Sequence, residues 1–287
     1  MSTAIRHPGA LTCVLITVLT IVAAIAPLSP PAVMGIVAVG LFLVLKVLTF
    51  LSQTHSEGRW YDLLAWCFAT PTLNAADFLA GRRPGAAVRW RSEFLLPLAF
   101  VIFGLATLIY VVPLLKSQSP VLAGYAAIAA LLSVLHFGLL HLIVSFWNLA
   151  GFKLKPLMNA PWDSSSVTEF WGQRWNTAFR DLVHRHVFLP TLRRYGQTWA
   201  LLTVFLASGL IHELAISVPA RAGYGGPTLY FLIQAVAVLM ERRVPEGRSA
   251  ATRTVRQITT WIILLLPMPL LFHQPFRDRV ILPLLPW

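Results

Sequence analysis

A histidine and a glutamate, His212 and Glu213, stand side by side inside a strongly apolar run of the sequence. The run extends from Trp199 to Val218, which is the length that an α-helix needs to cross a bilayer. An ionisable residue at the centre of a membrane helix costs roughly 2.5–3.5 kcal/mol on insertion scales, and such residues usually face a cavity and mark a function. A proton-accepting side chain beside an acid at this depth indicates chemistry on a substrate that lives in lipid.

A second polar stretch, Asn159 to Asn176, precedes this run. Ser166 and Glu169 have the spacing of a capping box, which predicts a helix that begins there and stops before Pro190. Apolar residues then recur at steps of three and four, as in an amphipathic helix at a membrane surface. Asn176 falls on the apolar side, and a polar amide there is expected to face the protein interior. A helix-surface position or a local cap is the alternative for this asparagine.

Two motifs within these stretches resemble one family. Phe170-Trp-Gly-Gln-Arg-Trp-Asn176 is similar to the FWxxRWN signature of plant-type wax synthases. Ala207-Ser-Gly-Leu-Ile-His-Glu-Leu214 is similar to their SGxxHEL signature. These enzymes belong to the membrane-bound O-acyltransferase superfamily. The motifs stand in the family's order, and the resemblance covers roughly residues 155–218.

The resemblance implies acyl transfer from an acyl-coenzyme A to the hydroxyl group of a lipophilic alcohol, which forms an ester. The family histidine corresponds to His212, which would deprotonate the alcohol, since the pKa of histidine lies near operating pH. The family asparagine corresponds to Asn176, which would donate an amide N–H to the thioester oxygen as that atom gains charge. Glu213 would orient or polarise the imidazole.

The resemblance also implies substrate contacts. Arg174 would attract the phosphates of coenzyme A. From their residue type alone, Trp171 and Trp175 are expected to lie mainly in an aromatic belt at the membrane interface, and in addition to pack around the substrate tunnel. Acyl-CoA enters as a co-substrate, and no cofactor is expected. Gly172-Gln173 replaces the more basic pair common in the first motif. The donor chain length, the acceptor alcohol and the oligomeric state stay open.

Metal chemistry is the first competing interpretation, because His212 and Glu213 open an HExxH pattern. The fifth position of that pattern is Ile216 in place of histidine, so the zinc-protease signature fails. His184 and His186 are two residues apart, a spacing that points them in different directions on a helix. We expect no metal site.

A small transporter or channel is the rival function. His136 and His141 lie in another apolar run, and with Glu213 they would supply a polar path. That interpretation predicts solute- or proton-coupled flux that does not depend on Asn176. A satisfied buried position is an equally good explanation of either histidine.

The composition is that of a polytopic membrane protein. The chain is 57% hydrophobic and 12% charged, with mean hydropathy +0.70, whereas soluble domains carry about 25% charged residues. The net charge of +12 does not indicate nucleic acid, because the basic residues sit in a few loops between apolar runs. We expect a single integral domain over residues 1–287, an all-α bundle of about seven to eight transmembrane helices around a buried reaction cavity.

Seven spans are predicted in total: 10–27, 32–51, 94–115, 121–148, 198–218, 226–241 and 257–273. The less apolar segment Trp60–Leu79 is expected to form an interfacial or re-entrant helix pair. The first span resembles a signal peptide, but a second apolar run follows at once, which favours a retained hairpin.

The basic residues give the orientation. With a cytoplasmic N-terminus, eighteen of the 23 Lys and Arg residues fall on the inner side, as the positive-inside rule requires. Lys46 lies near the inner end of its span and is expected to snorkel towards the interface.

Overall fold

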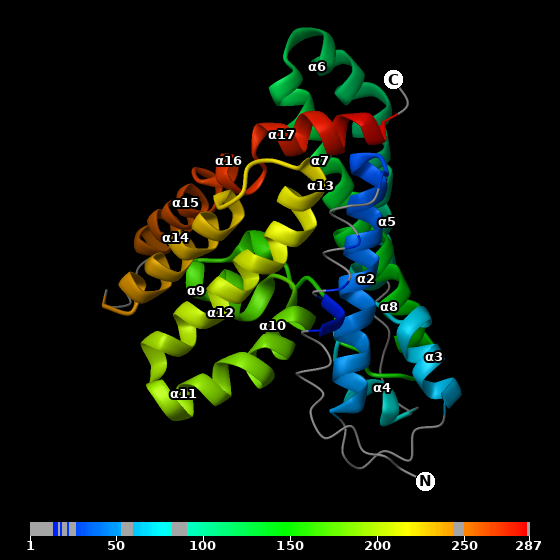
Figure 1. Ribbon diagram of the computed structural model, residues 1–287, viewed down its shortest axis with the longest axis vertical. Coiled ribbons are helices and arrows are strands. Elements are labelled where there is room, and N and C mark those ends of the chain that lie inside the picture. Colours follow the sequence, from blue (N-terminus) through cyan, green and yellow to red (C-terminus); the bar gives the residue numbers. More distant parts are fainter. Residues whose placement is uncertain are drawn as a thin grey trace. The chain divides into compact units, whose positions relative to one another are not determined.

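The computed structural model describes residues 14–16, 18, 22, 27–52, 60–81, 91–243 and 250–285, and within these ranges the chain is helical without a strand (Figure 1). The all-α class is therefore confirmed. The chain divides into two compact units, residues 1–157 with 285–287 and residues 158–284, and each is described by itself. One integral domain over residues 1–287 stays a prediction.

Five helical stretches of the described residues are long and apolar enough to cross a membrane: Pro30–Leu51, Glu93–Gln118, Pro120–Leu149, Gln197–Ala220 and Arg253–Leu271. They confirm five of the seven predicted spans and make the chain an integral membrane protein. The predicted span 226–241 forms a helix of 16 residues, about 24 Å long, against a hydrocarbon core of about 30 Å. The predicted span 10–27 lies largely outside the described residues.

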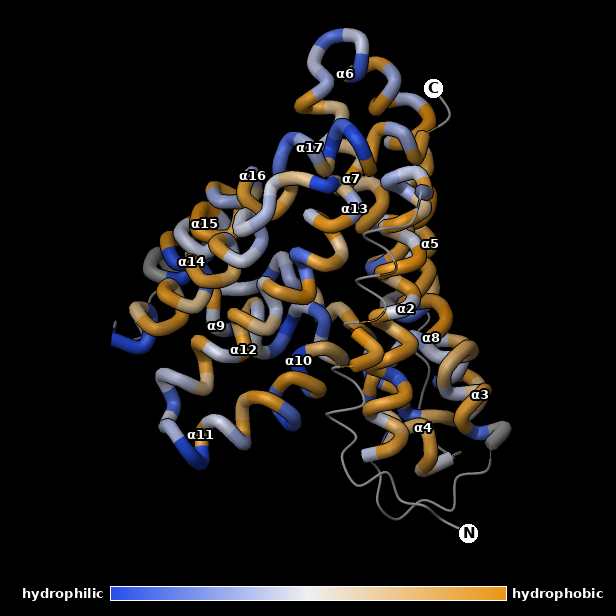
Figure 2. The backbone as a smooth tube through the Cα atoms, viewed as in Figure 1, coloured by the Kyte–Doolittle hydropathy of each residue, from blue (hydrophilic) through white to orange (hydrophobic). Residues whose placement is uncertain are grey.

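The first unit consists of long apolar helices interrupted by π-helical turns. Its elements are α2 (Pro30–Leu51), α3 (Trp60–Ala69), α4 (Ala75–Leu79), η1 (Arg91–Leu95), α5 (Leu96–Ala106), η2 (Thr107–Val111), α6 (Val112–Gln118), α7 (Pro120–Leu132), η3 (Ser133–Leu139) and α8 (Leu140–Leu149). Prolines occupy the first turns of α2 and α7, where the missing N–H is not needed, whereas the prolines of α5 and α6 each follow a π-helical turn within one continuous helical stretch. Figure 2 shows hydrophobic residues along most of α2 and α5.

The segment 60–79 forms the predicted helix pair, α3 and α4, and a buried lysine ties it to α2. Lys46 is fully buried, and its Nζ donates to Trp66 O and to Thr70 Oγ1, each at 2.6 Å. The Trp66 indole donates in return to Lys46 O at 3.2 Å. The expectation that Lys46 snorkels is wrong, because the end of α3 offers the ammonium group its acceptors inside the protein.

The second unit carries both motifs. Its elements are η4 (Pro161–Asp163), α9 (Val167–Glu169), η5 (Phe170–Arg174), α10 (Thr177–Val183), η6 (His184–Phe188), α11 (Leu189–Tyr195), α12 (Gln197–His212), η7 (Glu213–Ser217), α13 (Val218–Ala220), α14 (Gly226–Glu241), α15 (Ala250–Leu265), α16 (Met268–Leu271), α17 (Gln274–Phe276), η8 (Arg277–Ile281) and η9 (Leu282–Leu284). Helix α12 packs against α14 and α11, and α14 also packs against α16 (Figure 1).

The prediction of one amphipathic helix that begins at Ser166 and stops before Pro190 is wrong in two respects. The helix breaks at Trp175, which is extended, and at Asn176, which is left-handed with φ 40° and ψ 60°. Asparagine tolerates this region better than most residues, and the hydrophobic period continues across the break, so the pattern did not show it. The helical run also does not stop before Pro190. It continues through the π-helical turn η6 into α11, and Pro190 lies in the first turn of α11.

Candidate active site

Asn176 links the two helices of the first motif. Its side-chain Oδ1 accepts the N–H of Phe179 at 3.2 Å and so caps α10, while its own N–H donates to the Met158 sulfur at 3.4 Å. The cap fixes the orientation of the amide, because only the oxygen can accept that N–H. The Nδ2 amide nitrogen is therefore the hydrogen-bond donor that the side chain has left, and it has no acceptor among the described residues. The local cap and an available donor coexist in one side chain.

His212 ends α12 with one ring nitrogen committed. Its Nδ1 lies 2.7 Å from the carbonyl oxygen of Ser208, one turn earlier. A carbonyl only accepts, so Nδ1 carries the hydrogen, and in the neutral ring the lone pair is on Nε2. The ring also packs on Phe231 of α14, with centroids 4.5 Å apart. The backbone of the second motif thus selects the tautomer that has a basic Nε2.

Asn176 and His212 line one cavity of about 100 Å³ within the second unit. Its other lining residues are Trp171, Trp175, Phe179, Arg180, Val183, Val204, Phe205, Ser208 and Phe231. Five aromatic rings and four polar or charged side chains therefore surround a small void, which is the composition of a site that holds an apolar substrate and fixes it by few hydrogen bonds.

The second motif also sets the spacing of its helices. A Cβ on Gly209 would lie 2.7 Å from the Cα of Thr228, so α12 reaches α14 only because this residue has no side chain. Glu213 Oε1 then accepts from the N–H groups of Gly225 and Thr228 and from Thr228 Oγ1, at 2.9, 3.1 and 3.0 Å. Glu213 binds the first turn of α14 and makes no hydrogen bond to His212 in the described part of the chain. It holds the helix that carries Phe231.

The tryptophans of the first motif belong to the cavity wall. Trp171 contacts Phe205 and Phe231, and its indole nitrogen lies 3.4 Å from Gln234 Oε1. Trp175 stacks on Phe170 with centroids 5.2 Å apart. Gln234 is fully buried and donates to Ile263 O at 3.0 Å. It thereby connects Trp171 to α15, a role that no sequence pattern indicated.

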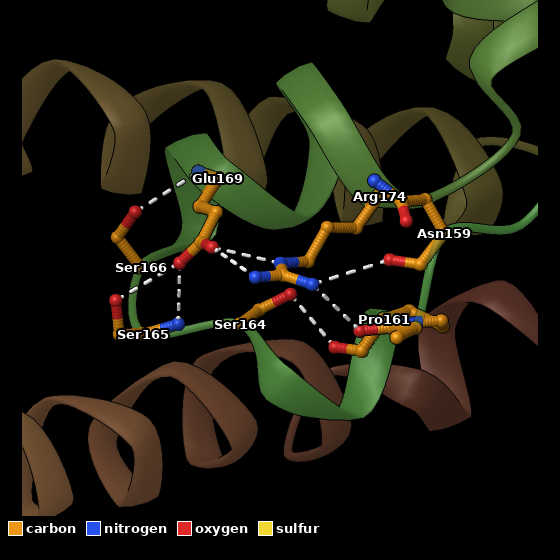
Figure 3. A network of polar contacts seen from close by, with 8 residues as sticks. Asn159, Pro161, Ser164, Ser165, Ser166, Glu169 and Arg174 are labelled. Carbon is orange, nitrogen blue, oxygen red and sulfur yellow. Dashed lines mark hydrogen bonds and ion pairs between the residues drawn. The ribbon is translucent and has the colours of Figure 1, made fainter.

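Arg174 lies outside this cavity, in a network of its own (Figure 3). Its guanidinium group pairs with Glu169 at 2.6 Å and donates to the carbonyl oxygens of Asn159 and Ala160. Ser166 caps α9 as predicted, with its Oγ 2.9 Å from the Glu169 nitrogen. Figure 3 shows that these bonds close the loop before the first motif. Each of the three nitrogens of the Arg174 guanidinium group therefore already contacts an oxygen of the protein.

The carboxylate of Glu169 completes the loop. Its Oε2 accepts from the N–H and the Oγ of Ser165, at 2.8 and 2.9 Å. Burial by itself would raise the pKa of Glu169, but the hydrogen bonds from Ser165 and Arg174 outweigh burial and hold the pKa below its ordinary value. The loop is therefore built around an ionised carboxylate.

A larger cavity of about 330 Å³ adjoins the first and shares Trp171, Arg180 and Phe205 with it. The two cavities also share Val183 and Val204, and the wall of the larger one adds His184, Arg242, Phe188, Leu201 and Val238. Arg180 and His184 are four residues apart on one helical run, and that spacing was the available signal for a shared face. This outer cavity combines cationic side chains with an apolar wall.

Among the residues that the structure describes, no group of three or more His, Cys, Asp or Glu side chains is placed to hold a metal ion.

Residues 154–233 match the sequence model of the Membrane bound O-acyl transferase family. The chain is similar to human diacylglycerol O-acyltransferase 1, with 48% identity over 61 residues that cover 21% of this chain and 12% of the relative. It is similar to a long-chain-alcohol O-fatty-acyltransferase of Simmondsia chinensis, with 29% identity over 118 residues that cover 38% of this chain and 34% of the relative. An acyl-CoA–sterol O-acyltransferase of Arabidopsis thaliana is 26% identical over 136 residues, or 44% and 39%. The matched segments thus span well under half of each relative.

Proposed function

Because the chain belongs to the wax synthase-like branch of the membrane bound O-acyl transferase family, we propose that it transfers an acyl group from an acyl-CoA to the hydroxyl group of a lipophilic alcohol. The products are an ester and free coenzyme A. The observation that supports this proposal best is the common cavity of Asn176 and His212, which offers one base and one hydrogen-bond donor in an apolar surrounding.

The proposed reaction uses two of the polar side chains of this cavity, His212 and Asn176. His212 Nε2 takes the proton from the alcohol hydroxyl, and the alcohol oxygen forms a bond to the thioester carbonyl carbon. The carbonyl oxygen gains negative charge, and Asn176 Nδ2 donates a hydrogen bond to it. The carbon–sulfur bond then breaks, and the sulfur of coenzyme A receives the proton from His212. Ser208 O keeps Nδ1 protonated throughout. The proposed reaction steps use no cofactor and no metal.

Glu213 acts through position. Its three hydrogen bonds hold the start of α14, and α14 places Phe231 against the His212 ring. We assign it to the catalytic arrangement as a positioning residue.

The outer cavity is the proposed entry of the donor. Arg180, His184 and Arg242 would attract the phosphates of coenzyme A, and the apolar wall would take the adjoining chain. The proposal takes these loops and the N-terminus to be cytoplasmic, as the count of basic residues predicts, and acyl-CoA would approach from that side. Arg174, which we expected to bind the phosphates, instead holds the loop that precedes the motif.

The acceptor is proposed as a lipophilic alcohol without a narrower choice. The relatives' names include acceptors as different as long-chain alcohols, sterols and diacylglycerol. An aromatic wall of five rings accommodates an alkyl chain or a flat ring system.

The test is an ester-forming assay with the purified protein in detergent. Radiolabelled acetyl-CoA and oleoyl-CoA are each supplied with hexadecanol, a sterol or a diacylglycerol, and the ester and free coenzyme A are measured. H212A is expected to lower turnover by about 10²–10⁴-fold, which is the contribution typical of a general base. The absence of ester with every donor and acceptor pair would refute the proposal.

The variant N176D separates catalysis from folding. It keeps an oxygen that caps α10 but replaces the Nδ2 donor with an anion, so turnover is expected to fall by about 10²–10³-fold without loss of thermal stability. N159D is the matched control, because Asn159 contacts Arg174 through its backbone and its side chain is exposed. Equal rates for N176D and N159D would exclude Asn176 from the reaction.

A further inference from the structure

A carboxylate at the end of α14 holds the start of the first motif helix. Glu241 Oε1 accepts from the N–H of Val167 at 2.7 Å. Its Oε2 accepts from the N–H of Thr168 at 2.9 Å and from Thr168 Oγ1 at 2.8 Å. The first N–H groups of a helix have no acceptor within the helix, so Glu241 supplies the acceptors that α9 lacks. Glu241 belongs to neither sequence motif.

This carboxylate stands at the rim of the outer cavity. Thr168, which it binds, and Arg242, its neighbour in the chain, both line that cavity. Neither residue lines the smaller cavity that contains Asn176 and His212. The three hydrogen bonds of Glu241 therefore fix the part of the wall where a donor enters and leave the reacting groups to other contacts.

Helix α14 is held by a carboxylate at each end. Glu213 accepts from Gly225 and Thr228 at its start, and Glu241 reaches from its last turn to α9. The first contact orders the side of the helix that faces His212. The second orders the rim of the outer cavity. The two carboxylates are thus expected to influence different kinetic constants.

We infer that Glu241 is a positioning residue for donor binding, which holds Thr168 and Arg242 in place at the outer cavity. The inference rests on the proposed function, since the donor is taken to be an acyl-CoA. Both oxygens of Glu241 accept hydrogen bonds, so glutamine cannot replace this residue. The amide nitrogen of glutamine is a donor and cannot accept a hydrogen bond from the N–H groups that it would face. Loss of this contact loosens the rim while the base and the amide donor keep their geometry.

The test compares E241Q with the wild type and with R243Q. Arg243 is the exposed residue two positions along and lines neither cavity, so R243Q controls for the loss of one charged side chain at this end of α14. For E241Q we expect the KM for oleoyl-CoA to rise about tenfold with kcat within about twofold of wild type. R243Q is expected to keep both constants. A fall in kcat without a rise in KM, or no change in either, would overturn the inference.

Two measurements do not depend on turnover. Hydrogen exchange of a peptide that covers residues 164–170 is expected to be about tenfold faster in E241Q, because the N–H groups of Val167 and Thr168 lose their acceptors. The equilibrium Kd of radiolabelled oleoyl-CoA is expected to rise about tenfold. Unchanged exchange would show that the contact does not hold α9. An unchanged Kd would refute the role of Glu241 in donor binding, even for a protein that forms no ester. Failure of the wild type to form any ester would refute only the proposed function.

Discussion

The close contact of α12 with α14 gives a quantitative test of the site. In G209A, the new Cβ would lie 2.7 Å from the Cα of Thr228, whereas ordinary contacts lie at 3.4–4 Å. Neither atom is at the end of a flexible side chain, so the two helices must separate by about 0.7 Å. The hydrogen bond from Thr228 Oγ1 to Glu213 would then lengthen from 3.0 Å to about 3.7 Å, beyond bonding range.

This displacement is expected to reduce kcat by about 10- to 100-fold, because a misplacement of 1 Å can cost about 10² in rate. Overpacking of this kind also lowers the free energy of unfolding by about 1–3 kcal/mol. Turnover and thermal unfolding of the detergent-purified G209A variant would be measured beside G35A. A Cβ on Gly35 meets no atom within 4 Å, so G35A is expected to keep the wild-type kcat and stability. Wild-type kcat in G209A would refute the argument that this helix contact sets the geometry of His212.

Three further outcomes are expected. E169Q should lower the melting temperature above about pH 4.5, and the difference from the wild type should vanish as pH falls. The folded-state pKa of Glu169 lies below its ordinary value of 4.5, so the stabilisation by Glu169 is lost as pH falls through the folded pKa. A difference in melting temperature that is independent of pH would contradict this. Q234L should reduce the free energy of unfolding by about 1–3 kcal/mol, measured by thermal melting, because the Trp171 indole and the Ile263 carbonyl lose their partner; an unchanged melting temperature would count against it. Dialysis against EDTA should leave the rate of ester formation unchanged, and a loss that divalent metal restores would show that a metal takes part.

The sequence predicted the parts of this molecule that depend on apolar runs and on short motifs. A stretch of about 20 apolar residues is long enough to cross the hydrocarbon core of a bilayer, and exposing it to water would cost free energy. Five spans could therefore be located from the apolar runs of the sequence alone. The two motifs identified Asn176 and His212, and the structure brings both to one cavity. The spacing of Ser166 and Glu169 located the start of α9.

Features that depend on single backbone conformations or on distant partners were not predictable. The break at Asn176 is a left-handed residue inside a continuous hydrophobic period, and the period does not register φ. Arg174 was predicted to attract the phosphates of coenzyme A, and Lys46 to reach the membrane interface, but each finds acceptors in segments that only the fold brings close. Glu241 binds α9 across more than 70 positions of sequence, and no local pattern indicates such a contact.

The most direct test of the central claim is the rate of ester formation by the double variant H212A/N176D, compared with each single variant under saturating donor and acceptor. If both side chains act on one transition state in one cavity, their losses are not additive, and the double variant is expected within about threefold of H212A alone. A double variant whose rate falls by the product of the two single losses would contradict a shared site.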